Sequence, residues 1–193
     1  MILDNFFLKL NYDLDWEKLK PIAKLQVEIP EQDNLANKSQ SSYLNLHNKT
    51  INLVELQPYY TWLLEKVKEY AFVELKYPPS TNISLQNAWF QQYFSGGYVT
   101  AHNHPDSIFT TVLYLEIPTD SSFIMLKDPY YDHKLKYSKD GSDEWLWQTL
   151  KVKESDLFIF EGGVVHKTNP NTTNNDKWCL VTNIGINYKK SII

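Results

Sequence analysis

The chain contains no arginine, and all nineteen of its basic residues are lysine. Arginine is the residue that presents a planar fork of N–H donors and binds a carboxylate through two parallel hydrogen bonds. Lysine offers only a point charge on a flexible stem. Any carboxylate ligand held by a cationic side chain of this protein must therefore be held by lysine.

Cysteine is nearly absent, because Cys179 is the only one, and this excludes an internal disulfide. Cys179 lies in an apolar run, where a buried thiol is the expected role. An excess of positive charge is also missing, since the formal net charge is −4. We therefore expect no broad nucleic-acid-binding surface.

Long hydrophobic runs are missing as well. No segment reaches the length of a membrane span, and the first residues lack the basic start of a secretory signal. We therefore expect a cytoplasmic protein without membrane partners. The 193 residues suffice for one domain with a sizeable core, and the apolar content of 42% is not typical of a disordered chain.

The pattern predicts a single domain over residues 1–193. In it, residues 1–80 form a support of helices and loops, and residues 83–188 form a β-rich core. The clearest helix is predicted over residues 57–72, where apolar side chains recur at three- and four-residue spacing. Such a stripe favours a helix that covers one face of a sheet.

The signals that precede this helix are weaker. A strand is expected over residues 2–10. A short helix follows, capped by Asp13 or Asp15 and ended near Pro21, because proline disrupts a helix interior. Residues 28–50 are polar and are predicted to be a long loop.

After residue 79 the hydrophobic period changes to two, which is typical of strands. Glycine, proline and asparagine clusters divide this region, and Ser95-Gly96-Gly97 is read as one of the turns. Many short strands without intervening helices predict a double-stranded β-helix, or jelly roll. Residues 128–144 are read as a rim loop whose His133 could contact a substrate. The predicted strands cover residues 83–94, 98–103, 108–117, 122–127, 145–152, 156–160, 164–168 and 177–188.

Two of the five histidines, His102 and His104, lie two residues apart, and Asp106 follows at the same spacing. Side chains at i and i+2 of an extended segment point to one face, so either neighbouring pair can reach one metal ion. His166 comes sixty-two residues after His104, between a Gly-Gly pair and another predicted turn. A close pair with one distant histidine is the spacing of a three-ligand facial site with open positions, which suggests non-haem Fe(II).

Several short elements, in order and spacing, resemble the 2-oxoglutarate- and Fe(II)-dependent oxygenases, and most closely the phage and bacterial members with a His-x-His-Pro motif. The resemblance covers roughly residues 83–187. It is carried by Asn87-Ala88-Trp89-Phe90, His102-Asn103-His104-Pro105, Thr111-Val112-Leu113-Tyr114-Leu115, Asp128-Pro129, Asp156-Leu157-Phe158-Ile159-Phe160 before His166, and Asp176-Lys177 before Thr182-Asn183-Ile184. It implies Fe(II) as the metal, 2-oxoglutarate and O₂ as co-substrates and, for a phage-encoded member, the host cytoplasm as location.

The sequence around this motif is also similar to that of prolyl hydroxylases. In them, a tyrosine precedes a Gly-containing turn, and the metal-binding pair and a Tyr-Leu strand follow. Tyr93 and Tyr114 occupy the matching places, which implies that they bind 2-oxoglutarate or line its pocket. Lys177 opens the strand after the last ligand, where most members carry a basic residue that pairs with the far carboxylate of 2-oxoglutarate.

The chain departs from the superfamily in the close pair, which is usually His-x-Asp or His-x-Glu. We favour His102, His104 and His166 as the ligands. Asp106 is the alternative to His102, in a set of His104, Asp106 and His166. A three-histidine set is neutral, so the iron would keep its full double charge.

The resemblance implies hydroxylation of a C–H bond coupled to decarboxylation of 2-oxoglutarate. The likeness to prolyl hydroxylases makes a peptide or amino-acid side chain the first substrate to consider. Two other functions stay open from the sequence. One is a cupin-like three-histidine dioxygenase or isomerase that does not use 2-oxoglutarate, and the other is a non-catalytic jelly-roll binding module. The oligomeric state is not readable from the sequence.

Overall fold

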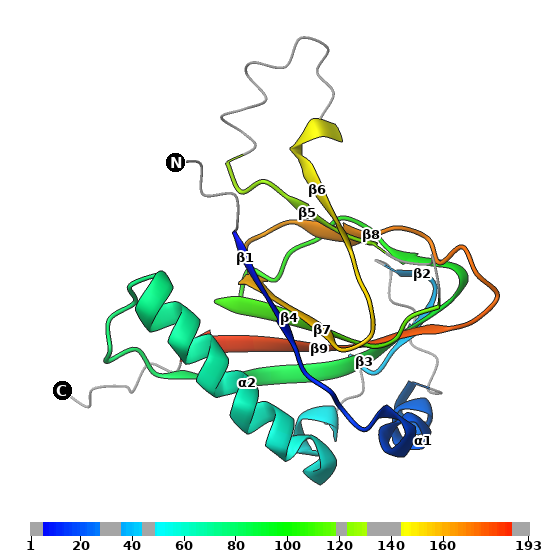
Figure 1. The fold of residues 1–193 in the computed structure, drawn as a ribbon, viewed down its shortest axis with the longest axis horizontal. Coiled ribbons are helices and arrows are strands. Elements are labelled where there is room, and N and C mark those ends of the chain that lie inside the picture. The colour runs from blue at the N-terminus through cyan, green and yellow to red at the C-terminus, as the bar shows by residue number, and fades with distance from the viewer. Residues whose placement is uncertain (1–5, 28–35, 44–48, 119–122, 131–143, 187–193) are drawn as a thin grey trace.

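The computed structural model describes residues 6–27, 36–43, 49–118, 123–130 and 144–186. Its strands form two antiparallel sheets, one of six strands in the order β1-β7-β4-β9-β3-β2 and one of three in the order β6-β5-β8 (Figure 1). The predicted β-rich jelly roll is confirmed. The strands are β1 (Phe7–Asn11), β2 (Ala36–Ser41), β3 (Ile83–Val99), β4 (Phe109–Glu116), β5 (Phe123–Lys127), β6 (Trp147–Lys151), β7 (Asp156–Glu161), β8 (His166–Thr168) and β9 (Lys177–Ile186).

Helices cover one face of the six-stranded sheet (Figure 1). The two main helices are α1 (Trp16–Val27) and α2 (Gln57–Glu69), and a π-helical turn, η3 (Tyr70–Glu74), extends α2 to slightly beyond its predicted end. Leu63 and Val67 of α2 are fully buried against this face, as the apolar stripe predicted. Short 3-10 helices lie at η1 (Lys49–Asn52), η2 (Val54–Leu56) and η4 (Glu144–Leu146).

Helix α1 does not end near Pro21, so that prediction was wrong. It begins where predicted, since Asp15 Oδ1 accepts a hydrogen bond from the Lys18 amide at 3.2 Å. Pro21 lies on the exposed side, while Leu19 and Ala23 on the opposite side are buried. Burial of that stripe outweighs the lost backbone hydrogen bond.

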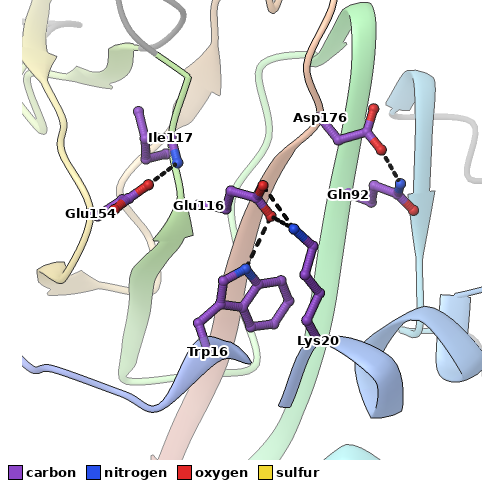
Figure 2. Close-up of polar contacts among 7 residues, drawn as sticks. All are labelled: Trp16, Lys20, Gln92, Glu116, Ile117, Glu154 and Asp176. Carbon is purple, nitrogen blue, oxygen red and sulfur yellow. Dashed lines mark hydrogen bonds and ion pairs between the residues drawn. The ribbon is translucent and has the colours of Figure 1, made fainter. Parts of the chain in front are cut away.

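Polar contacts also fix the start of α1 to the sheet (Figure 2). Trp16 Nε1 donates to Glu116 Oε2 at 3.0 Å, and Lys20 Nζ lies 2.7 Å from the same oxygen. Glu116 closes β4, so these contacts join the helix to the end of a central strand. No helix in the described part of the chain is long and apolar enough to cross a membrane.

Two predictions about residues 28–103 were wrong for one shared reason. Ser95-Gly96-Gly97 is not a turn but part of β3, and residues 36–41 of the predicted loop form β2 beside it. A Cβ on Gly97 would lie 2.4 Å from the Lys38 carbonyl oxygen, and Gly96 has φ +76°. The glycines therefore allow close, bulged pairing with β2.

Candidate metal centre

The two close histidines follow β3, and backbone hydrogen bonds hold them to the segment that leads into β8. His102 and His166 form an isolated antiparallel bridge. The amide nitrogen of His102 lies 3.0 Å from the carbonyl oxygen of His166, and the reverse pair lies 2.8 Å apart. The amide of His104 donates to the Gly162 carbonyl at 2.8 Å. Strand pairing thus brings together residues that lie more than sixty positions apart in the chain.

Gly162 allows this close approach. A Cβ at this position would lie 2.1 Å from the Ser107 carbonyl oxygen and 2.6 Å from that of His104. Both distances are shorter than any real Cβ contact. Only glycine therefore fits where the two segments cross.

The three imidazoles of His102, His104 and His166 converge. One nitrogen from each lies within 4.8 Å of the other two, and the ring centroids are 4.2 to 5.2 Å apart. His166 is buried and the other two rings are partly buried. Within the described residues this is the one cluster suited to a metal, and it does not include Asp106, which is exposed in the turn after His104.

The outer nitrogens of two rings have partners that fix the tautomer. Nδ1 of His102 lies 2.9 Å from the Thr100 carbonyl oxygen, and Nδ1 of His166 lies 3.0 Å from that of Val164. A carbonyl can only accept, so each Nδ1 carries the ring proton and each Nε2 keeps its lone pair. This is the form in which imidazole binds a metal.

His104 differs in its partner. Its Nδ1 lies 3.2 Å from the amide nitrogen of Asn183 on β9, and its Nε2 is buried without a hydrogen-bond partner. Asn183 is held in turn by Thr110, whose hydroxyl lies 3.0 Å from the amide oxygen. A buried polar atom without a partner is costly, and this one belongs to a ring of the three-imidazole cluster.

Burial also sets the charge of the cluster. Burial, with the neighbouring His102, lowers the pKa of His104 to about 4. The same two causes, with His104, lower the pKa of His166 well below its usual value. Both rings are therefore neutral at pH 7 and can bind a metal without first losing a proton.

A cavity of about 220 Å³ adjoins the three histidines. Its walls follow the period-two alternation of three neighbouring strands, so that Trp89 and Gln91 of β3 stand opposite Val181 and Cys179 of β9 in register, and Tyr93 of β3 also lines the cavity. Val112 and Tyr114 of β4 complete this wall. Beyond the cavity lining, the same strand faces continue to Thr110 on β4 and to Asn183 on β9. The remaining cavity-lining residues include Tyr43, Val99, Asn103, Ile124, Lys167 and Thr168. Cys179 is buried as predicted, and burial raises the pKa of its thiol to about 11.

Lys177 lies on this face at the opposite end of β9 from Asn183. Its side chain is buried, and its Nζ has no hydrogen-bond partner in the described structure. The ammonium lies over the rings of Tyr93 at 4.7 Å and Tyr114 at 5.2 Å, and burial lowers its pKa to about 8. The Tyr114 hydroxyl is likewise buried without a partner. A buried cation and a buried hydroxyl without partners are groups whose chemistry suits an anionic ligand.

The start of β9 is fixed by a contact outside the cavity. Gln92 Nε2 donates to Asp176 Oδ2 at 2.7 Å (Figure 2). Because Gln92 and Asp176 directly precede Tyr93 and Lys177, this bond keeps the cross-strand pair of tyrosine and lysine in register.

The structure therefore groups the six favoured site residues into two sets, with the histidines in one and Tyr93, Tyr114 and Lys177 in the other. Five of the six line one cavity, and Lys177 lies next to it against the two tyrosine rings. Sequence reasoning missed the roles of Trp89, Gln91, Val181 and Asn183. Their signal was present, since each shares a strand face with a predicted residue at even spacing. His133, predicted to lie on a rim loop, is outside the described residues.

The sequence matches the profile of a family described as "Putative 2OG-Fe(II) oxygenase" over residues 87–183, which is just over half of the chain. The matched span contains all the residues of both sets. A comparison with curated proteins found no match.

Solved structures share the fold at low sequence identity. A prolyl-4-hydroxylase from Pseudomonas putida is 12% identical, with a TM-score of 0.62 over 96% of this chain and 95% of that one. The viral collagen prolyl hydroxylase vCPH from Paramecium Bursaria Chlorella virus-1, in complex with 2OG, is 12% identical, with a TM-score of 0.56 over 94% and 96%. HygX from Streptomyces hygroscopicus, with nickel, 2-oxoglutarate and hygromycin B bound, is 9% identical, with a TM-score of 0.57 over 93% and 82%.

Proposed function

The chain belongs to the 2OG-Fe(II) oxygenase family, and we propose that His102, His104 and His166 bind its iron while Lys177 and Tyr114 bind the far carboxylate of 2-oxoglutarate. The protein is an enzyme whose cofactors are Fe(II) and 2-oxoglutarate, with O₂ as the second co-substrate. One observation carries the assignment of residues: three convergent imidazoles line the same cavity as Tyr93 and Tyr114, whose rings lie beside a buried ammonium that has no partner.

The histidines fit the metal by their chemistry. Three neutral imidazoles suit a first-row divalent ion such as Fe(II), and the cavity beside them leaves room for further ligands. The position of Asp106, exposed and outside the cluster, supports His102 over Asp106 as the third ligand. Without a carboxylate ligand, the iron keeps its double positive charge, which favours the dianionic co-substrate.

The second set of residues fits 2-oxoglutarate. In a chain without arginine, Lys177 supplies the positive charge and Tyr114 supplies an O–H donor. Burial raises the pKa of Tyr114 well above its usual value, so its hydroxyl stays protonated. Tyr93 and Tyr114 hold the ammonium between their rings and so fix its position.

Bound iron and 2-oxoglutarate together activate O₂ and couple decarboxylation to hydroxylation of a C–H bond. The protein itself orients these groups and limits water around them. The apolar side chains of Val112, Ile124 and Val181 line the cavity between the two sets of residues. Such walls strengthen electrostatic interactions inside the site.

We propose a peptide or amino-acid side chain as the substrate. Two of the similar structures are prolyl hydroxylases, which supports this choice by fold-level analogy. The cavity is also bordered by Tyr43, which is 46% exposed, and its ring packs edge-on against Trp89 at 4.7 Å. This aromatic pair offers a surface to an aliphatic side chain.

The ligand set is tested by metal analysis of three variants after anaerobic loading with Fe(II). His102→Ala and His166→Ala are expected to retain less than about a tenth of the iron, because two ligands hold the ion far more weakly than three. Asp106→Ala serves as the control and is expected to bind iron fully. Loss of iron in Asp106→Ala with retention in His102→Ala would instead assign the third position to the carboxylate.

A further inference from the structure

Asn183 is the partner that distinguishes His104 from the other two histidines. Its side chain is 4% exposed and lies between the Nδ1 of His104 and the hydroxyl of Thr110. Thr110 and Asn183 are direct cross-strand partners on β4 and β9, so the sheet fixes this arrangement. A ring nitrogen next to a backbone carbonyl can only donate to it, but a ring nitrogen next to an amide group can donate or accept.

In the structure, Asn183 presents its amide nitrogen to His104 and its amide oxygen to Thr110. An amide N–H needs a lone pair on Nδ1, so the ring proton of neutral His104 lies on Nε2. That is the atom buried without a partner beside the other two imidazoles. Binding a metal through Nε2 requires the opposite tautomer, with the proton on Nδ1.

A half-turn of the Asn183 amide satisfies both requirements. It places the amide oxygen against Nδ1–H and the amide nitrogen against Thr110. The hydroxyl of Thr110 can serve either orientation, because it both donates and accepts. The pair of Asn183 and Thr110 is thus hydrogen-bonded in each state.

We propose that Asn183 is a positioning residue that selects the tautomer of His104, and that its amide turns over when the metal binds. This inference rests on the proposed role of His104 as an iron ligand. A neutral amide permits both tautomers, whereas a carboxylate would hold the proton on Nδ1 in every state. In this proposal, the ring proton of His104 lies on Nε2 before metal binding, where it blocks the metal-binding atom. It lies on Nδ1 after metal binding, which leaves the lone pair of Nε2 free for the metal.

The tautomer of His104 is measured directly by ¹⁵N NMR of the wild-type protein, without metal and loaded with Zn(II) as a diamagnetic probe. Resonances are assigned by comparison with His104→Gln. The expected result is a proton on Nε2 without metal and on Nδ1 with Zn(II). The same tautomer in both samples would overturn the proposed turnover of the amide.

The Fe(II) affinity of two Asn183 variants provides a second test, because the two substitutions are expected to change the affinity in opposite directions. Asn183→Leu is expected to bind Fe(II) about ten- to hundredfold more weakly, the usual cost of losing the partner of a metal-bound histidine. Asn183→Asp is expected to bind it more tightly, by about tenfold at pH 8, because a carboxylate accepts from Nδ1–H and adds negative charge near the ion. Affinity is read by anaerobic competition with a chromophoric chelator.

Asn174→Asp is the matched control, since it adds the same charge at an exposed position that neither lines the cavity nor belongs to the histidine cluster. It is expected to change Fe(II) affinity by less than about threefold, because solvent screens an exposed charge. Equal weakening by Asn183→Leu and Asn183→Asp would show a packing role only and overturn the proposal.

His104→Ala separates this inference from the proposed ligand set. If that variant keeps iron, His104 is not a ligand and the proposed metal centre itself is wrong. If it loses iron while both Asn183 variants bind like the wild type, the metal centre stands and only the role of Asn183 is refuted.

Discussion

The environment of Lys177 is the strongest support for its proposed role in binding 2-oxoglutarate. A buried ammonium without a hydrogen-bond partner is unfavourable in the protein alone, and its pKa of about 8 expresses that cost. A carboxylate brought next to it relieves the cost and gains a charge-assisted hydrogen bond. The cost of burying the Lys177 ammonium therefore favours the binding of an anion beside it.

Replacement of this lysine by methionine removes the charge and keeps much of the side-chain volume. Lys177→Met is expected to weaken 2-oxoglutarate binding by about tenfold to a hundredfold, since a hydrogen bond to a charged group contributes about 1.5–3 kcal/mol. The measurement is anaerobic titration of the Fe(II) protein with 2-oxoglutarate. Lys167→Met is the control, because Lys167 also lines the cavity but stacks on Trp147 at 4.1 Å.

The pH dependence of the same titration tests whether the positive charge of Lys177 contributes to 2-oxoglutarate binding. Lys177 must be protonated to pair with the carboxylate, and burial lowers its pKa to about 8. Affinity is therefore expected to be level below pH 8 and to fall above it, by up to about tenfold per pH unit. A level profile is expected for Lys177→Met. A wild-type profile that stays level to pH 10 would contradict the role given to Lys177.

The sequence predicted which histidines lie together, as the structure shows, but it did not predict their hydrogen-bond partners. His102 and His104 lie at i and i+2, and this spacing alone places both side chains on one face of an extended segment. The contact between Asn183 and His104 joins residues seventy-nine positions apart. It depends on the register of β4 against β9, which local patterns do not specify.

Among the secondary-structure elements, the wrong predictions came from glycine and proline, because each of these residue types occurs in more than one structural setting. Gly96 and Gly97 were read as a turn, but glycine also permits close pairing of strands. The partner strand β2 has the sequence Ala-Asn-Lys-Ser-Gln-Ser, whose polar character fits an edge strand and hides the strand signal. Pro21 was read as a helix stop, although it lies on the exposed side of α1.

Gly162 lies where the segment that carries His102 and His104 crosses the segment before β8. Its neighbour Gly163 provides a matched control for a prediction about this crossing. Gly162→Ala is expected to lower the free energy of unfolding by about 1–3 kcal/mol or more, because its Cβ would overlap backbone oxygens. It is also expected to weaken Fe(II) binding, since the Gly162 carbonyl accepts from His104. Urea unfolding and chelator competition measure the two effects.

Gly163→Ala is the control for this prediction, because a Cβ there meets no atom within 4 Å. It is expected to leave Fe(II) affinity unchanged and to stabilise the protein slightly, by up to about 1 kcal/mol, through the unfolded state. Similar behaviour of the two alanine variants would mean that the close approach at Gly162 does not hold the ligand segment in place.

In the molecule as a whole, the six-stranded sheet packs against the helices on one face and borders the candidate site on the other. The helices cover one face, together with the larger apolar core (Figure 1). The cavity, with the three histidines at its border, lies against the other face. Adjacent residues of β4 and β9 serve the two faces in turn, as Leu113 and Leu180 on the helix side and Tyr114 and Cys179 on the cavity side show. Residues before position 80 contribute β1 and β2 to this sheet as its two edges.

We propose that one site holds Fe(II) at His102, His104 and His166 and 2-oxoglutarate at Lys177. Anaerobic addition of 2-oxoglutarate to the Fe(II) protein tests it without knowledge of the substrate, because keto-acid chelation produces a weak visible metal-to-ligand charge-transfer band. The band is expected in the wild type and is expected to be absent in His166→Ala. Lys177→Met is expected to need about tenfold to a hundredfold more 2-oxoglutarate to reach the same absorbance. An iron-loaded wild-type protein that shows no band and forms no succinate from 2-oxoglutarate would contradict the proposal.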